Sequence, residues 1–153
     1  MKIKIGKYPR SHSTPRRVNV HIDPWDTYSL DHTLALIILP ALKAFREHTD
    51  RGCPGDLADG VSVTEGCKKW GEIVDKMIWS FNEIANDDPN EPKYPGEIKF
   101  IETGKTELGI ATRSETTATD EQVEIWRKQF NEYAARVQEG LDLFGKWYQN
   151  LWW

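Results

Sequence analysis

An almost unbroken apolar run at residues 34–42 most constrains how this chain can fold. It is about half as long as a membrane span, which requires roughly 20 residues. Because apolar side chains cover every side of the helix they would form, the run predicts a central, fully buried helix. We expect this helix to extend over residues 30–48. We also expect it to bend at Pro40, which lacks an N–H and collides with the carbonyl group of Leu36.

Two further long helices are predicted by apolar residues at helical spacing. The first begins near Thr64, and its apolar positions are Trp70, Ile73, Val74, Met77, Ile78, Phe81 and Ile84. The second begins at a capping box formed by Thr119 and Gln122. Its apolar positions are Val123, Trp126, Phe130, Tyr133, Val137, Leu141, Phe144, Tyr148 and Leu151. The chain therefore has three long helices.

Strands are predicted where apolar and polar residues alternate. Residues 2–7 and 17–23 show this pattern, and residues 97–103 and 106–112 are predicted to form a hairpin that turns at Gly104 and Lys105. If Val18, Val20 and Ile22 face the core, His21 and Asp23 project from the opposite face. The fold class is therefore α+β, with a small, largely antiparallel sheet of about four strands. We expect one domain over residues 1–153, made of a basic N-terminal arm (1–16) and a body (17–153).

The charge of the chain is unevenly distributed. Its first 17 residues hold six basic residues and no acid, whereas the net charge of the whole chain is −4, so the rest carries −10. Broad nucleic-acid binding needs a basic face on the folded body, so this distribution argues against it. Cys53 and Cys67 lack the second cysteine pair of a zinc site, so free thiols are expected. The absence of a signal peptide and of a membrane span predicts a soluble cytoplasmic protein without a membrane partner.

Three blocks of sequence resemble a family of small proteins from tailed bacteriophages. They are Ser29-Leu-Asp-His-Thr-Leu-Ala-Leu-Ile-Ile-Leu-Pro-Ala-Leu-Lys43, Trp70-x-x-Ile-Val-Asp-Lys-Met-Ile-Trp79-x-Phe81 and Gly140-Leu-x-Leu-Phe-Gly-Lys-Trp-Tyr-Gln-Asn-Leu-Trp152. The blocks fall in the three predicted helices. The resemblance implies a phage origin and an accessory role in the cytoplasm of the infected bacterial host, and it transfers no catalytic residue.

The polar cluster that precedes the apolar run is the first candidate site. His21, Asp23, Asp26, Asp31 and His32 offer imidazole and carboxylate ligands at a strand end and a helix start. Such groups can converge on one metal ion and activate a bound water, as in a metal-dependent phosphodiesterase or other hydrolase. No HExxH or other standard ligand spacing is present. We therefore expect no metal, no cofactor and no catalytic residue, and keep hydrolysis as an alternative.

A pocket for a nucleotide-like ligand is the favoured hypothesis. Aromatic rings stack on bases, and basic side chains bind phosphates, arginine in bidentate fashion. The candidate ligand-binding residues are Arg16, Arg17, His21, Trp25, Asp26, Tyr28, His32 and Lys105. Together with the phage resemblance, they suggest a non-enzymatic binder that sequesters a nucleotide signal of bacterial immunity, as a counter-defence.

The remaining alternative is a protein-binding inhibitor or assembly factor. Seven tryptophans are a heavy load for 153 residues, and tryptophan is enriched at interface hot spots. The candidate interface residues are Trp79, Trp147, Trp152 and Trp153. They would contact a host protein or the other subunits of a homo-oligomer.

Overall fold

The computed structural model describes residues 1–7, 14–106 and 109–152. Its long helices are α1 (Leu30–Arg46), α3 (Val63–Ala85) and α4 (Asp120–Trp147). A single turn, α2 (Gly55–Ala58), connects α1 to α3, and a short 3₁₀ helix, η2 (Tyr148–Asn150), follows α4. The α+β class and the three long helices are confirmed. No described helix has the length and hydropathy that a bilayer crossing needs.

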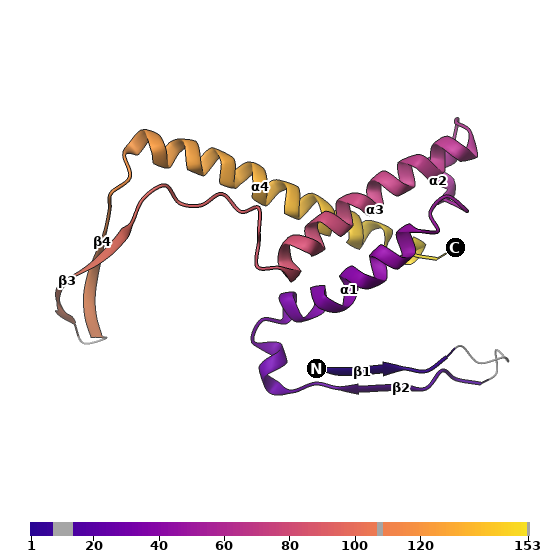
Figure 1. The fold of residues 1–153 in the computed structure, drawn as a ribbon, viewed down its shortest axis with the longest axis horizontal. Coiled ribbons are helices and arrows are strands. Elements are labelled where there is room, and N and C mark those ends of the chain that lie inside the picture. The colour runs from indigo at the N-terminus through magenta and orange to yellow at the C-terminus, as the bar shows by residue number, and fades with distance from the viewer. Residues whose placement is uncertain (8–13, 107–108, 153) are drawn as a thin grey trace.

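The helix at the centre of the fold is α3, which packs against α1 on one side and α4 on the other (Figure 1). Its predicted apolar stripe faces the core that α3 forms with residues of both neighbours. Four of the seven positions are buried, and Ile73, Ile78 and Ile84 are partly buried. Trp70 meets Trp147 of α4 edge to face at 5.6 Å, and Phe81 meets Phe144 of α4 at 4.9 Å. These aromatic pairs join the two longest helices.

The prediction that the first long helix is central and fully buried is wrong. α1 buries Ala35, Leu39 and Leu42 against α3 and leaves its other side exposed. Burial of an apolar helix surface is favourable, but the sequence pattern does not show whether the same chain or another molecule buries it. The helix continues through Pro40, and a bend at that residue stays a prediction.

The strands form two separate hairpins instead of one sheet. β1 (Lys2–Ile5) pairs antiparallel with β2 (Val18–His21), and β3 (Ile98–Thr106) pairs antiparallel with β4 (Gly109–Thr116). Figure 1 shows the two hairpins at opposite ends of the molecule. The number of strands and their antiparallel pairing agree with the prediction, whereas the single sheet does not.

The predicted turn at Gly104 and Lys105 is also wrong, because both residues lie within β3. The register shifts between Glu102 and Gly104, which marks a β-bulge. Gly104 has a φ of 154°, a conformation that residues with a side chain rarely adopt. Gly104 therefore lies at the β-bulge within β3 and not at a turn.

The β1–β2 hairpin stands away from the helices. Every residue of both strands is exposed, and no other described helix or strand packs on them. The alternation of Val18, Val20 and Ile22 was predicted correctly, but the core that they were expected to face is absent beneath them.

Candidate functional site

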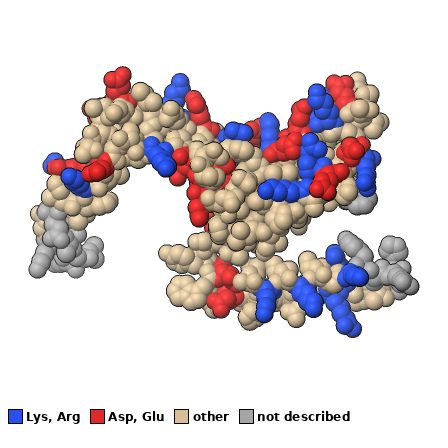
Figure 2. Space-filling view, in the orientation of Figure 1, with Lys and Arg blue, Asp and Glu red and all other residues tan. Residues whose placement is uncertain are grey.

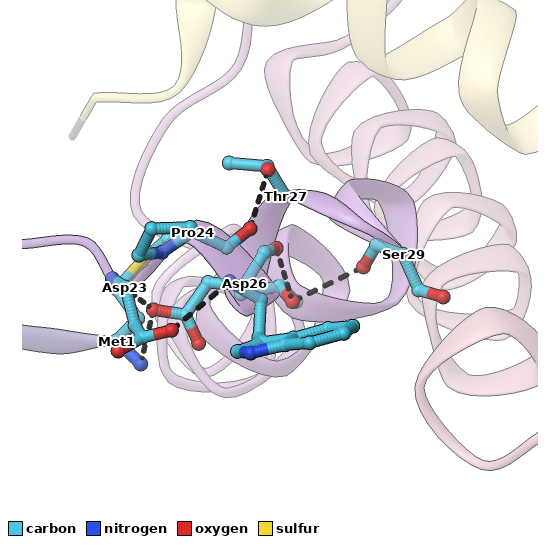
Figure 3. A network of polar contacts seen from close by, with 8 residues as sticks. Met1, Asp23, Pro24, Asp26, Thr27 and Ser29 are labelled. Carbon is cyan, nitrogen blue, oxygen red and sulfur yellow. Dashed lines mark hydrogen bonds and ion pairs between the residues drawn. The ribbon is translucent and has the colours of Figure 1, made fainter.

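A short 3₁₀ helix, η1 (Pro24–Thr27), connects β2 to α1 and is held by hydrogen bonds at both ends (Figure 3). Asp23 Oδ1 accepts a hydrogen bond from the backbone N–H of Trp25 at 3.0 Å. Asp26 Oδ2 accepts one from the N–H of Asp23 at 2.8 Å. These reciprocal bonds form a capping box, which satisfies N–H groups that a helix start would otherwise leave unpaired.

Two further contacts fix this turn to its surroundings. The amino group of Met1 lies 2.6 Å from Asp26 Oδ2, which connects the start of β1 to η1. Thr33 of α1 donates its hydroxyl to the carbonyl oxygen of Asp26 at 3.0 Å. The amino group of Met1 and the N–H of Asp23 both favour the carboxylate form, so the pKa of Asp26 is lowered. Asp26 is therefore a structural anion that joins a strand, a turn and a helix.

The turn presents two aromatic side chains to solvent. Trp25 is 81% exposed and Tyr28 is 85% exposed. Their ring centroids lie 6.4 Å apart with an angle of 57° between the ring planes. A planar base stacked on one ring would meet the other at an angle, so the pair does not form a parallel clamp. The two rings form an exposed aromatic pair on a backbone held by η1.

The structure brings together only part of the predicted ligand-binding set. Trp25, Asp26 and Tyr28 lie on η1 and at its end. His21 is at the end of β2, and Arg17 precedes that strand. Both are exposed.

The other three predicted ligand-binding residues lie elsewhere. Arg16 donates from Nε to the carbonyl oxygen of Gly6 at 2.6 Å, which closes the β1–β2 hairpin. The Nδ1 atom of His32 lies 3.0 Å from the carbonyl oxygen of Ile84, so this ring contacts the end of α3. Lys105 is in the β3–β4 hairpin, and its side chain lies outside the described residues. These three residues therefore lie in three different parts of the described structure: the β1–β2 hairpin, α1 and the β3–β4 hairpin.

The five residues of the hydrolase alternative do not form a metal-binding group. Asp23 and Asp26 accept the hydrogen bonds of the capping box, and His32 points to the end of α3. Among the described residues, no three His, Cys, Asp or Glu side chains are arranged to hold a metal ion. The arrangement of these side chains therefore gives no support to the alternative of a metal-dependent hydrolase.

No protein family, curated protein or solved structure matches the chain. The resemblance to tailed-phage proteins therefore stays a prediction from the sequence. What the protein does has to be inferred from its surfaces.

The four tryptophans predicted at an interface do not share one surface. Trp147 is only 6% exposed and belongs to the core, where it packs on Trp70. Trp79 is half-buried, and the guanidinium of Arg136 lies 3.8 Å from its ring centroid. Trp152 is 74% exposed. Trp153 lies outside the described residues.

A buried carboxylate at the end of α3 was not predicted from the sequence. Glu83 has no exposed surface, and its oxygens accept hydrogen bonds from the backbone and side chain of Asn90 at 3.1 and 2.8 Å. Tyr133 of α4 donates its hydroxyl to Glu83 at 3.3 Å and to Asp88 at 2.7 Å. Asp87 and Asp88 both have positive φ values, which are uncommon for residues other than glycine. Both residues lie in the tight turn that follows α3. This cluster joins α3, the turn and α4, and it has a structural role.

Proposed function

We propose that this chain is a non-enzymatic binding protein whose exposed aromatic pair, Trp25 and Tyr28, contacts the surface of another protein. The observation that carries the proposal is the combination of large exposed rings with a tightly held backbone. Single exposed apolar residues are common, but tryptophan and tyrosine side by side are the residue types that dominate binding energy at interfaces. A backbone already fixed by hydrogen bonds loses little conformational entropy on binding.

The open geometry of the pair favours a protein target over a nucleotide. Small ligands bind in concave sites that cover most of their surface, whereas Trp25 and Tyr28 project from a turn. The basic residues assigned to phosphate are not gathered around the rings, because Arg16 closes the hairpin and Lys105 is in the other hairpin. Sequestration of a nucleotide signal therefore stays a prediction from the sequence. The tailed-phage resemblance supports a target in the infected bacterial cell.

The proposal is tested by site-specific photocrosslinking followed by reconstitution. A photoreactive phenylalanine analogue replaces Tyr28, and proteins crosslinked in a bacterial lysate are identified and purified. Their dissociation constants are then measured for the wild-type chain, for Trp25→Ala/Tyr28→Ala and for Trp152→Ala. Trp152 is the matched control because it is also largely exposed and lies at the other end of the chain. We expect the double variant to weaken binding by at least about thirtyfold, equivalent to ~2 kcal/mol, and the control to leave it unchanged.

A parallel thermal-shift experiment uses a panel of cyclic and ADP-ribose-type nucleotides. A nucleotide at a hundred times its dissociation constant stabilises a protein by about 2.7 kcal/mol. If a nucleotide raises the melting temperature of the wild type and not that of Trp25→Ala/Tyr28→Ala, the site takes a nucleotide and the protein-binding proposal fails. Equal binding of the purified target by all three chains also contradicts the proposal.

A further inference from the structure

α1 has a second apolar stripe that no part of the described chain covers. Leu30, Leu34, Ile37 and Ala41 recur at spacings of four, three and four residues, so they share one face of the helix. All four are exposed, whereas the stripe that faces α3 is buried. The exposed stripe continues into a groove of about 350 Å³ between α1 and the end of α4, which is lined by apolar side chains that include Phe45 and Phe144.

The β1–β2 hairpin also has an uncovered apolar face. Ile3 pairs with Val20 and Ile5 pairs with Val18, so these four side chains project from the same face. Their exposed fractions lie between 39% and 61%. A two-stranded hairpin with nothing packed on it is at best marginally stable in water, so this face requires a cover.

The two uncovered faces belong to neighbouring parts of the molecule. Figure 1 shows the hairpin extending alongside α1, and Figure 2 shows open space between them with basic side chains mostly along the outer edge of the hairpin. In the described structure β1 and β2 make no contact with α1, so the hairpin does not cover the stripe of its own helix. Each chain thus carries two apolar faces and covers neither.

We propose that a second copy of this chain covers both faces, with the apolar face of one hairpin packed on the exposed stripe of α1 in the other copy. A two-fold axis makes the contact reciprocal, so that each copy gives one hairpin and one helix and both of these apolar faces are covered. The charges agree with this arrangement, because residues 1–17 carry six positive charges and the rest of the chain carries a net charge of −10. A basic hairpin is therefore attracted to the body of a second copy.

The occupant is a second copy because the same chain carries both apolar faces, one on the hairpin and one on α1. Two copies can therefore cover both kinds of face at once. This interface uses Ile3, Val20 and Ile37, whereas the proposed function uses Trp25 and Tyr28. Either proposal can therefore fail without the other.

The oligomeric state tests the proposal directly. Size-exclusion chromatography with light scattering is expected to give twice the chain mass of 17.7 kDa for the wild type. Ile3→Ser/Val20→Ser removes one opposed pair from the apolar face, and because the contact occurs twice we expect its dimer dissociation constant to rise at least about a hundredfold. The control is Lys4→Arg/Asn19→Ser, an opposed pair on the other face of the same strands that keeps the charge of the hairpin, and it is expected to remain dimeric.

Helical circular dichroism shows whether the variants fold. None of the four substituted side chains lies in the helical core, so the helix signal is expected to be unchanged in both variants. A monomeric wild type overturns the proposal. A dimer that Ile3→Ser/Val20→Ser leaves intact overturns it as well, because another surface would then hold the copies together.

A mixed disulfide tests which helix meets the hairpin. One batch carries Val20→Cys and the other Ile37→Cys, both with Cys53→Ser so that the half-buried native thiol is absent. Mixing and mild oxidation are expected to give a reducible product containing one chain of each kind. Asn19→Cys, on the opposite face of β2, replaces Val20→Cys in the control mixture and is expected to give none. No product with Val20→Cys, or equal product with both, contradicts the assigned contact.

Discussion

Gly140 of α4 lies directly on Ser80 of α3, so closely that a Cβ atom at position 140 would overlap the Ser80 hydroxyl oxygen. The same hydroxyl donates within its own helix to the carbonyl oxygen of Lys76 and across the interface to that of Arg136, each at 3.3 Å. Two small residues thus allow the backbones of the longest helices to come into contact. The hydroxyl uses the resulting space to bond both helices.

Gly140→Ala is expected to lower the free energy of unfolding by about 1–3 kcal/mol, because the added methyl group forces the helices apart. Gly145→Ala is the matched control, since a Cβ atom at that position meets nothing within 4 Å. It is expected to raise stability by ~0.5–1 kcal/mol, as alanine does in an unobstructed helix. Urea denaturation at one fixed protein concentration measures both. A stabilising Gly140→Ala would contradict the close packing of α3 and α4.

Tyr133→Phe is expected to lower the free energy of unfolding by about 1–3 kcal/mol, because Asp88 and buried Glu83 lose the hydroxyl donor that they share. Tyr28→Phe serves as the control, since that ring is exposed and its hydroxyl is not part of the cluster. The control is expected to be neutral within ~0.5 kcal/mol. Equal effects of the two substitutions in the same denaturation experiment would exclude a stabilising role for the Tyr133 hydroxyl.

The same tyrosine predicts a dependence of stability on pH. Burial raises the pKa of Tyr133 above its ordinary value of 10.0, and the nearby carboxylates of Asp88 and Glu83 raise it further. The protonated phenol is therefore favoured by folding, so its contribution is complete below pH 10 and is lost as the pH rises above that value. Between pH 9 and 11 we expect the wild type to lose more stability than Tyr133→Phe. Parallel curves for the two proteins would contradict this expectation.

Asp26→Asn is expected to release the start of β1, because the amide cannot form an ion pair with the Met1 amino group. Hydrogen exchange of the β1 and β2 amides should become faster, whereas Asp31→Asn in the first turn of α1 should leave it unchanged. The lowered pKa of Asp26 means that the ion pair is present above the ordinary value of 3.8 and is lost as the pH falls through the lower folded value. Carboxyl carbon NMR measures that value directly. An Asp26 that titrates at or above 3.8 would exclude the pairing.

Trp147→Ala is expected to lower the free energy of unfolding by about 3–5 kcal/mol, because this ring lies in the core. Trp152→Ala is expected to change it by less than ~0.5 kcal/mol, because that side chain is exposed. Comparison of the two by denaturation separates a core role from a surface role. A neutral Trp147→Ala would restore the original prediction that this tryptophan serves an interface.

Local features were predictable from the sequence because they depend on residues close in the chain. The capping box is confirmed atom by atom, with Thr119 Oγ1 accepting from the N–H of Gln122 at 3.3 Å and Gln122 Oε1 accepting from the N–H of Thr119 at 2.9 Å. The start of α3 was misplaced by two residues, because Ser62 and not Thr64 accepts the capping hydrogen bond. Trp25 and Tyr28 were selected from the sequence, and their proximity follows from a separation of three residues in a turn.

Features that depend on distant parts of the chain were not predictable in the same way. The apolar run in α1 indicated that this helix is covered. A helix at the centre of the fold also needs small residues, so that the neighbouring helices can approach it closely. α3 has the small residues that permit this: Gly66 lies against Ala58, Gly71 against Arg46 and Ser80 against Gly140. The small residues Gly66, Gly71 and Ser80 were therefore the sequence feature that indicated the central position of α3. The separation of the hairpins left no comparable signal, since alternating strands look the same whether or not a core lies beneath them.

The length of α4 has a mechanical consequence. Its 28 residues span about 42 Å at 1.5 Å per residue. Of the α4 residues whose contacts with α3 are described above, Tyr133 lies nearest the start of the helix. The first part of α4 projects beyond α3 and leads back to the β3–β4 hairpin (Figure 1). Trp126 braces this part by donating to the carbonyl oxygen of Pro92 at 2.8 Å. Because the hairpin lies far from the contact between Gly140 and Ser80, any rotation of α4 at that contact would move the hairpin by a larger distance than it moves the contact.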